Sequence, residues 1–137
     1  MHKIMALDVG TKRIGIALSD FLRVIATPYN TISRIPEKDA IEKIIKIAKE
    51  NRVEKIVIGV PINMDGTKGE RVEKTYAFAE ALKEKVNCQI DYMDERLTTV
   101  TAERILIDGN VRRDKRKQVI DKLAATIILQ SYLDCKK

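Results

Sequence analysis

Two strand-like apolar segments with a very short polar connection stand at the start of the chain. The segments Ile4–Val9 and Ile14–Ser19 are separated by Gly10-Thr11-Lys12-Arg13. Such a connection favours a tight reversal, so the spacing predicts an antiparallel hairpin. Asp8 lies near the end of the first segment, where a carboxylate among apolar residues needs a cation or hydrogen bonds to offset its desolvation. The sequence therefore predicts a hairpin that holds one acid at a fixed place on a sheet, as a metal or phosphate site requires.

The order of the later segments predicts an α/β fold. The almost wholly apolar run 55–61 is typical of a strand buried on both faces, and amphipathic helical spacing flanks it. Strands are expected at 3–9, 13–19, 23–28 (with Pro28 at its exit), 55–61 and 88–93. Four helices are expected. The first begins at 36, the second follows a loop at 63–69, the third runs from 98 or 99 to 108, and the fourth covers 116–134. Three antiparallel strands followed by strands that alternate with helices indicate a mixed five-stranded sheet flanked by helices.

The size and apolar content of the chain fit one domain. It has 137 residues, of which 45% are hydrophobic, enough to bury a substantial core over residues 1–137. No apolar run approaches the roughly 18 residues that a membrane-spanning helix needs. The short apolar start ends at Asp8 and has no small-residue cleavage pattern. We therefore expect a cytoplasmic protein without a membrane partner.

The composition excludes the commonest kinds of histidine and cysteine chemistry. His2 is the only histidine, and Cys88 and Cys135 have no metal-ligand spacing. Any catalysis would therefore rely on carboxylates, lysines or a hard metal ion. The net charge of +6 favours a polyanionic partner such as nucleic acid.

Three acids occupy strand ends and helix starts, where a rigid α/β scaffold presents functional groups. Asp8 ends the first strand, Glu95 follows the fifth, and Asp121 lies in the first turns of the last helix. If they converge, Mg²⁺ or Mn²⁺ would relieve their repulsion, because these ions prefer oxygen ligands. Two such ions about 4 Å apart can activate a water molecule so that it attacks a phosphodiester bond. Taken singly, Asp121 could instead cap its helix and Glu95 could pair with Arg96.

Four motifs follow one another along the chain and together cover essentially all of it. They are Leu7–Asp20, Pro61–Thr67, Asp94–Thr99 (DERLTT) and Arg116–Ala125 (RK-x-x-x-D-x-x-AA). This set resembles the YqgF family, which comprises nucleases similar to Holliday junction resolvases.

The resemblance implies a fold, a site and an activity. It implies a ribonuclease H-like fold, and a catalytic and metal-binding triad that falls on Asp8, Glu95 and Asp121. It further implies a metal-dependent nuclease that processes the 5′ end of pre-16S rRNA during ribosome biogenesis. The alternative is a Holliday junction resolvase of DNA recombination and repair.

Basic and polar residues near these motifs are expected to contact the substrate. The densest basic run lies just before Asp121 and suits phosphate-backbone contacts, which position a strand without reading its sequence. Each of these residues also has a simpler explanation. Basic runs are typical of solvated surface, and Lys12 and Arg13 could serve only to keep the hairpin soluble. An Asp-Gly turn would explain the segment around Asn63. The expected substrate-binding residues are Lys12, Arg13, Asn63, Arg96, Arg112, Arg113, Arg116 and Lys117.

Two functions of other classes stay open. Asp8-x-Gly10-Thr11 followed by Gly15 also resembles the first phosphate loop of the actin and sugar kinase superfamily, although 137 residues leave no second domain to close on ATP. A non-catalytic nucleic-acid adaptor would keep the basic surface but would lack one of the three acids, and this sequence contains all three. Structured RNA is the favoured partner and branched DNA the alternative, for a monomer or a homodimer.

Overall fold

The computed structural model describes residues 1–135, and the side chains of all of these except 99–100 and 116–122. The elements run in the order β1 (Lys3–Val9), β2 (Arg13–Ser19), β3 (Ala26–Ser33), α1 (Glu37–Glu50), β4 (Val53–Val60), α2 (Glu70–Lys83), β5 (Gln89–Asp94), the 3₁₀ turn η1 (Glu95–Thr98), α3 (Thr99–Asp108), the 3₁₀ turn η2 (Arg113–Lys115) and α4 (Arg116–Cys135).

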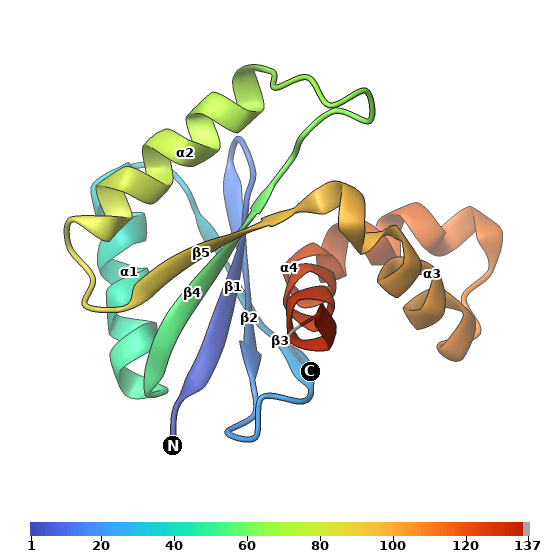
Figure 1. Ribbon diagram of the computed structural model, residues 1–137, viewed down its shortest axis with the longest axis horizontal. Coiled ribbons are helices and arrows are strands. Elements are labelled where there is room, and N and C mark those ends of the chain that lie inside the picture. The colour runs from blue at the N-terminus through green and yellow to red at the C-terminus, as the bar shows by residue number, and fades with distance from the viewer. Residues whose placement is uncertain (136–137) are drawn as a thin grey trace.

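The strands form one mixed five-stranded sheet in the order β3-β2-β1-β4-β5 (Figure 1). The pairs β1–β2 and β2–β3 are antiparallel, whereas β1–β4 and β4–β5 are parallel. The expected mixed sheet is therefore confirmed. Because β1, β4 and β5 run in the same direction, their carboxyl ends meet at one edge of the sheet, which is where α/β folds place their ligands.

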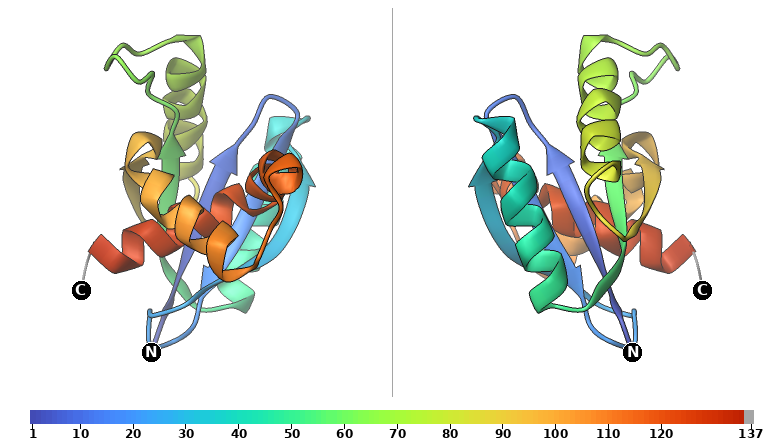
Figure 2. Two further views of the ribbon diagram at one scale, coloured as in Figure 1. Left: turned by 90° about the vertical axis from the view of Figure 1, so that its right-hand side faces the viewer. Right: turned by 90° about the vertical axis from the view of Figure 1, so that its left-hand side faces the viewer.

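Helices cover both faces of this sheet, with α1 and α2 on one face and α4 on the other (Figure 2). Side chains alternate between the two faces along a strand. In β1, Met5 and Leu7 accordingly pack with α1 and α2, while Ile4 and Ala6 pack against α4. The same alternation places Asp8 on the α4 face, at the end of the strand.

Small residues allow α4 to approach the sheet closely. Ala6 and Ala17 are fully buried beneath the helix, where Leu129 is also fully buried. A Cβ added at Gly59 would clash with Cδ1 of Ile128, so any larger residue at this point of β4 would force the Ile128 side chain to move. The position of α4 over the strand ends is therefore set by steric contact with the sheet.

The expected boundaries of the third strand were wrong. β3 runs over Ala26–Ser33 instead of 23–28, and Pro28 lies inside it rather than at its exit. β3 is an edge strand with a register shift next to Pro28, and an edge or a bulge tolerates proline because no ladder hydrogen bond is lost there. Val24 and Ile25 instead belong to a turn in which both backbone N–H groups donate to the carboxylate of Asp20, at 2.8 and 3.1 Å.

The helices begin close to their expected positions. α1 follows Pro36, α3 follows Thr98 and α4 starts at Arg116. Thr98 does not cap α3 through its side chain, because its hydroxyl donates instead to the carbonyl oxygen of Glu95 at 2.6 Å. Within the described residues, none of the helices combines the length and apolarity that crossing a membrane would need.

Candidate active site

Asp8 lies at the carboxyl end of β1, beside an open pocket of about 430 Å³ between the β1–β2 hairpin and α4. Its cross-strand partner is Gly15. A Cβ at Gly15 would lie 3.8 Å from the Cβ of Asp8 and 3.6 Å from the Cβ of Ala125 on α4. The glycine therefore leaves the space next to the carboxylate open, so that a ligand can reach it.

The turn of the hairpin carries two cations to the same pocket. The N–H of Gly10 donates to the carbonyl oxygen of Arg13 at 2.8 Å, and a Cβ at Gly10 would approach this oxygen to 2.8 Å. Glycine is therefore needed for the tight reversal. Lys12 and Arg13 are exposed and line the pocket together with Asp8. The structure thus brings these two expected substrate-binding residues close to the expected catalytic acid.

Glu95 is the first residue after β5 and is half-buried near the end of β4. Its Cγ would lie 3.3 Å from a Cβ added at Gly59. Burial raises the pKa of Glu95 from 4.5 to about 7, the negative charge of Asp8 adds to the rise, and the positive charge of Arg71 opposes it. Asp8 and Glu95 therefore lie within electrostatic range of each other.

Within the described residues, no hydrogen bond or ion pair reaches the carboxylate of Glu95. Its sequence neighbours are paired with each other instead. The guanidinium of Arg96 donates to both carboxylate oxygens of Asp94, at 2.7 to 3.2 Å, and this contact lowers the pKa of Asp94. A pairing of Glu95 with Arg96, which the sequence allowed, is thus replaced by the pair of Arg96 with Asp94.

The third expected acid lies among the residues whose side chains are not described. The backbone places Asp121 in α4, five residues after the helix begins at Arg116, so a role in capping the helix start is excluded. Ala125, one helical turn later, packs next to Gly15 and lines the Asp8 pocket. The side chains of Arg116 and Lys117 also lie outside the description.

A divalent cation fits the donor set that is described. Asp8 and Glu95 offer carboxylate oxygens, which hard ions such as Mg²⁺ and Mn²⁺ prefer. Their mutual repulsion helps to raise the pKa of Glu95 to about 7, and a cation between them would relieve it. The side chains that the structure describes include no cluster of three or more acids, histidines or cysteines able to hold a metal ion. Asp121, the third expected ligand, is not among them.

The other expected substrate-binding residues lie apart from the Asp8 pocket. Asn63 organises its own loop, because its Nδ2 donates to Oγ1 of Thr67 at 3.0 Å. Arg112 and Arg113 are exposed in the connection between α3 and α4, which projects away from the sheet (Figure 1). Arg112 lies 3.7 Å from a carboxylate oxygen of Asp114.

The sequence prediction missed Arg71, whose charge acts on Glu95. Arg71 is the second residue of α2 and is exposed. A signal was present in the sequence, since the positions three and four residues away from Arg71 carry no acid that could pair with it along a helix. Only the fold shows that the start of α2 lies near Glu95.

Comparisons with known proteins agree with this fold and these motifs. A protein of Clostridioides difficile (strain 630) is 50% identical over 134 residues, which cover 98% of this chain and 95% of the relative. A protein of Caldanaerobacter subterraneus subsp. tengcongensis is 49% identical over 136 residues and 98% of both chains. Both carry the name "Putative pre-16S rRNA nuclease".

The fold is similar to that of a ribonuclease H-like resolvase. Thermus thermophilus RuvC, solved in complex with a Holliday junction substrate, matches with a TM-score of 0.58 over 99% of this chain and 96% of that one, at 10% identity. A family model described as RuvX, Holliday junction resolvase, matches residues 2–135. With this match and with relatives at about half identity over nearly the full length, the chain belongs to the RuvX family.

Proposed function

We propose that this protein is a metal-dependent nuclease that hydrolyses phosphodiester bonds in structured RNA, with the 5′ leader of pre-16S rRNA as its substrate. The observation that carries the proposal is the pair of acids, Asp8 and Glu95, close enough for the charge of one to raise the pKa of the other at the edge where β1 and β5 end. The name shared by relatives at about half identity supports the choice of RNA.

In this proposal the side chains of the site have separate tasks. Asp8, Glu95 and Asp121 would hold two divalent cations. When bound, such cations polarise the phosphate and lower the pKa of water. Asp8 supplies a fixed anchor because it extends from a strand in the middle of the sheet. Lys12 and Arg13, exposed beside it, attract and orient the phosphate backbone.

A second candidate is the cleavage of four-way DNA junctions. The description of the matching family model favours it, and the site would perform the same chemistry on either nucleic acid. Symmetric cleavage of a junction needs two active sites, and therefore a homodimer. The two candidates differ in substrate and in oligomeric state but not in the acids that they require.

The test compares three proteins on two substrates. Wild type, Asp8→Asn and the control Asp39→Asn are incubated with Mg²⁺ or Mn²⁺ and with labelled pre-16S leader RNA or a four-way DNA junction. Asp39 is an exposed acid in the first turn of α1, so the control removes an equal charge away from the site. We expect wild type and the control to cleave the RNA, and Asp8→Asn to lose at least about 1,000-fold in rate while it still binds.

Each other result has a definite meaning. Cleavage of the RNA by Asp8→Asn at the wild-type rate would refute the assignment of the acid. Symmetric cuts in the junction, with the RNA left intact, would establish the second candidate. Binding without cleavage of either substrate would identify an adaptor.

A further inference from the structure

Arg71 is an exposed arginine whose charge no other described residue neutralises by direct contact. It lies in the first turn of α2, and no ion pair within 4 Å reaches it in the part of the chain that the structure describes. The neighbouring acid Glu70 pairs with Lys74 at 3.0 Å instead. The positions at helical spacing from Arg71 carry Thr and Lys, so the helix offers it no acid.

The start of α2 is tied to the hairpin that carries Asp8. One guanidinium nitrogen of Arg34 donates to the carbonyl oxygen of Gly10 at 2.8 Å, and the other donates to that of Lys74 at 3.5 Å. Lys74 lies one helical turn after Arg71. A single side chain thus bridges the turn that follows Asp8 and the first turns of α2, so the two segments lie next to each other.

The arginines around Glu95 differ in their freedom to bind a ligand. Arg96 is held by both oxygens of Asp94 and could leave only by breaking this pair. Arg71 has no such contact, yet its positive charge acts on the carboxylate of Glu95. An arginine presents a planar fork of donors that matches a phosphate oxygen pair, and it is therefore the side chain best suited to this contact.

We propose that Arg71 binds the substrate phosphate next to Glu95, on the side of the hairpin that carries Lys12 and Arg13, and so positions the scissile group beside the acids. This proposal rests on the proposed nuclease function. The negative phosphate would be held between the cations of the hairpin and the cation of α2. A lysine at position 71 would keep the charge but lose the two-pronged contact.

The experiment compares Arg71→Ala and Arg71→Lys with the matched control Lys83→Ala. Lys83 is exposed in the last turn of the same helix, so the control removes the same charge from its far end. With leader RNA and Mg²⁺, we expect Arg71→Ala to lower kcat by about 100-fold with a smaller change in KM, and Arg71→Lys to recover part of the loss. The control should keep the wild-type kcat.

Binding without cleavage gives an independent measurement. In EDTA, the affinity for labelled leader RNA is measured as a function of salt concentration. One lost phosphate contact reduces the slope of log K against log salt by about one. We expect this reduction for Arg71→Ala and not for Lys83→Ala, with unfolding temperatures close to that of wild type for both.

The two proposals fail in different ways. If wild type cleaves the RNA but Arg71→Ala resembles the control in kcat and in salt slope, the role of Arg71 is refuted and the nuclease function stands. If wild type cleaves nothing, while Arg71→Ala alone reduces the salt slope, the nuclease function fails and the phosphate contact stands.

Discussion

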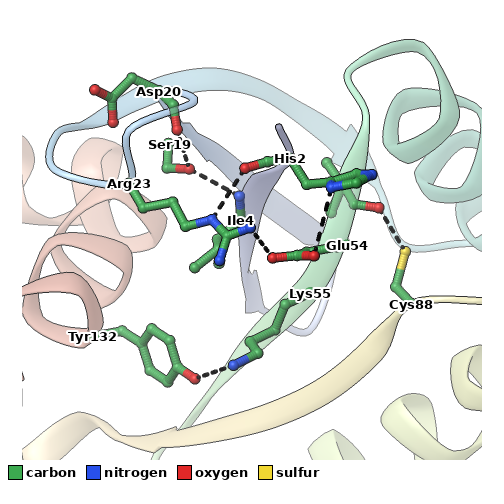
Figure 3. A network of polar contacts seen from close by, with 10 residues as sticks. His2, Ile4, Ser19, Asp20, Arg23, Glu54, Lys55, Cys88 and Tyr132 are labelled. Carbon is green, nitrogen blue, oxygen red and sulfur yellow. Dashed lines mark hydrogen bonds and ion pairs between the residues drawn. The ribbon is translucent and has the colours of Figure 1, made fainter. Parts of the chain in front are cut away.

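Polar groups are arranged in opposite ways at the two ends of the central sheet. At the end where β1 and β4 begin, polar groups of the side chains and the backbone are paired with one another (Figure 3). The N–H of Ile4 donates to Oγ of Ser19 at 2.8 Å, and this hydroxyl donates to the carbonyl oxygen of Asp20 at 2.9 Å. Arg23 pairs with Glu54 and donates to the carbonyl oxygen of His2 at 3.1 Å.

At the end where β1 and β5 stop, like charges are brought together. Burial raises the pKa of Glu95 to about 7, and the negative charge of Asp8 adds to the rise. Satisfied hydrogen bonds stabilise the first end, whereas the second end stores unfavourable electrostatic energy that a cation would release. The contrast separates an end whose hydrogen bonds maintain the fold from the end at which we propose that the substrate binds.

The largest effect on stability is expected from Glu95→Gln, measured without divalent cations. The folded protein holds the Glu95 proton more tightly than the unfolded chain, so its stability falls as pH rises from about 4.5 to about 7. At 1.36 kcal/mol per pKa unit, the loss approaches about 3 kcal/mol. Glu95→Gln has no carboxyl group at this position and therefore does not lose this stability. In EDTA at pH 8, urea unfolding should show the variant to be more stable than wild type. At pH 5 the difference in the free energy of unfolding should be much smaller.

Addition of divalent cation sharpens this test. Mg²⁺ or Mn²⁺ should raise the unfolding temperature of wild type at pH 8 by more than that of Glu95→Gln, because the variant has lost one ligand. If the free energies of unfolding of the two proteins differed by the same amount at pH 5 and at pH 8, the crowding of charges at this end would be contradicted.

A smaller effect of opposite sign is expected from Ser19→Ala at the paired end. The variant leaves the N–H of Ile4 without its acceptor in a buried position, and such a loss costs about 2 kcal/mol. Chemical denaturation should show this loss, and kcat should stay at the wild-type value because Ser19 is remote from Asp8 on the sheet. A fall in kcat with unchanged stability would show that the two ends are not separate in function.

The smallest effect is expected from Ser131→Ala on α4. In the described part of the chain, the Oγ of Ser131 is the buried side-chain oxygen that lacks a hydrogen-bond partner. Alanine removes this unsatisfied group and is a better helix former. The free energy of unfolding should therefore increase by about 1 kcal/mol. A decrease of that size, in the same denaturation experiment, would reveal a hydrogen bond to the hydroxyl.

The local sequence pattern predicted the elements of this fold well where only one local structure was compatible with that pattern. The hairpin around Gly10 and the buried strand before Pro61 were both predictable, because turn chemistry and apolar runs act over a few residues. The third strand was misplaced because proline is tolerated at a sheet edge, and no local signal tells an edge strand from a central one.

The site was predictable in part for the same reason. Asp8 and Glu95 could be identified as acids at strand ends, and in the structure the charge of Asp8 acts on the carboxyl group of Glu95. The roles of Arg96 and Arg71 could not be identified. Arg96 is held by Asp94, whereas the charge of Arg71 acts on Glu95, and this difference depends on how α2 packs beside the hairpin.

The sequence by itself determined which groups this protein can use: carboxylates in place of histidine, a glycine turn beside the first acid, and basic residues around it. The tertiary structure alone decided which of these groups act on one another. The parallel pairing of β1, β4 and β5 brings acids from distant segments to one edge, and the fit of Ile128 against Gly59 fixes α4 over them. The physical reason is that electrostatic and steric contacts depend on distance in space, which a one-dimensional pattern does not contain.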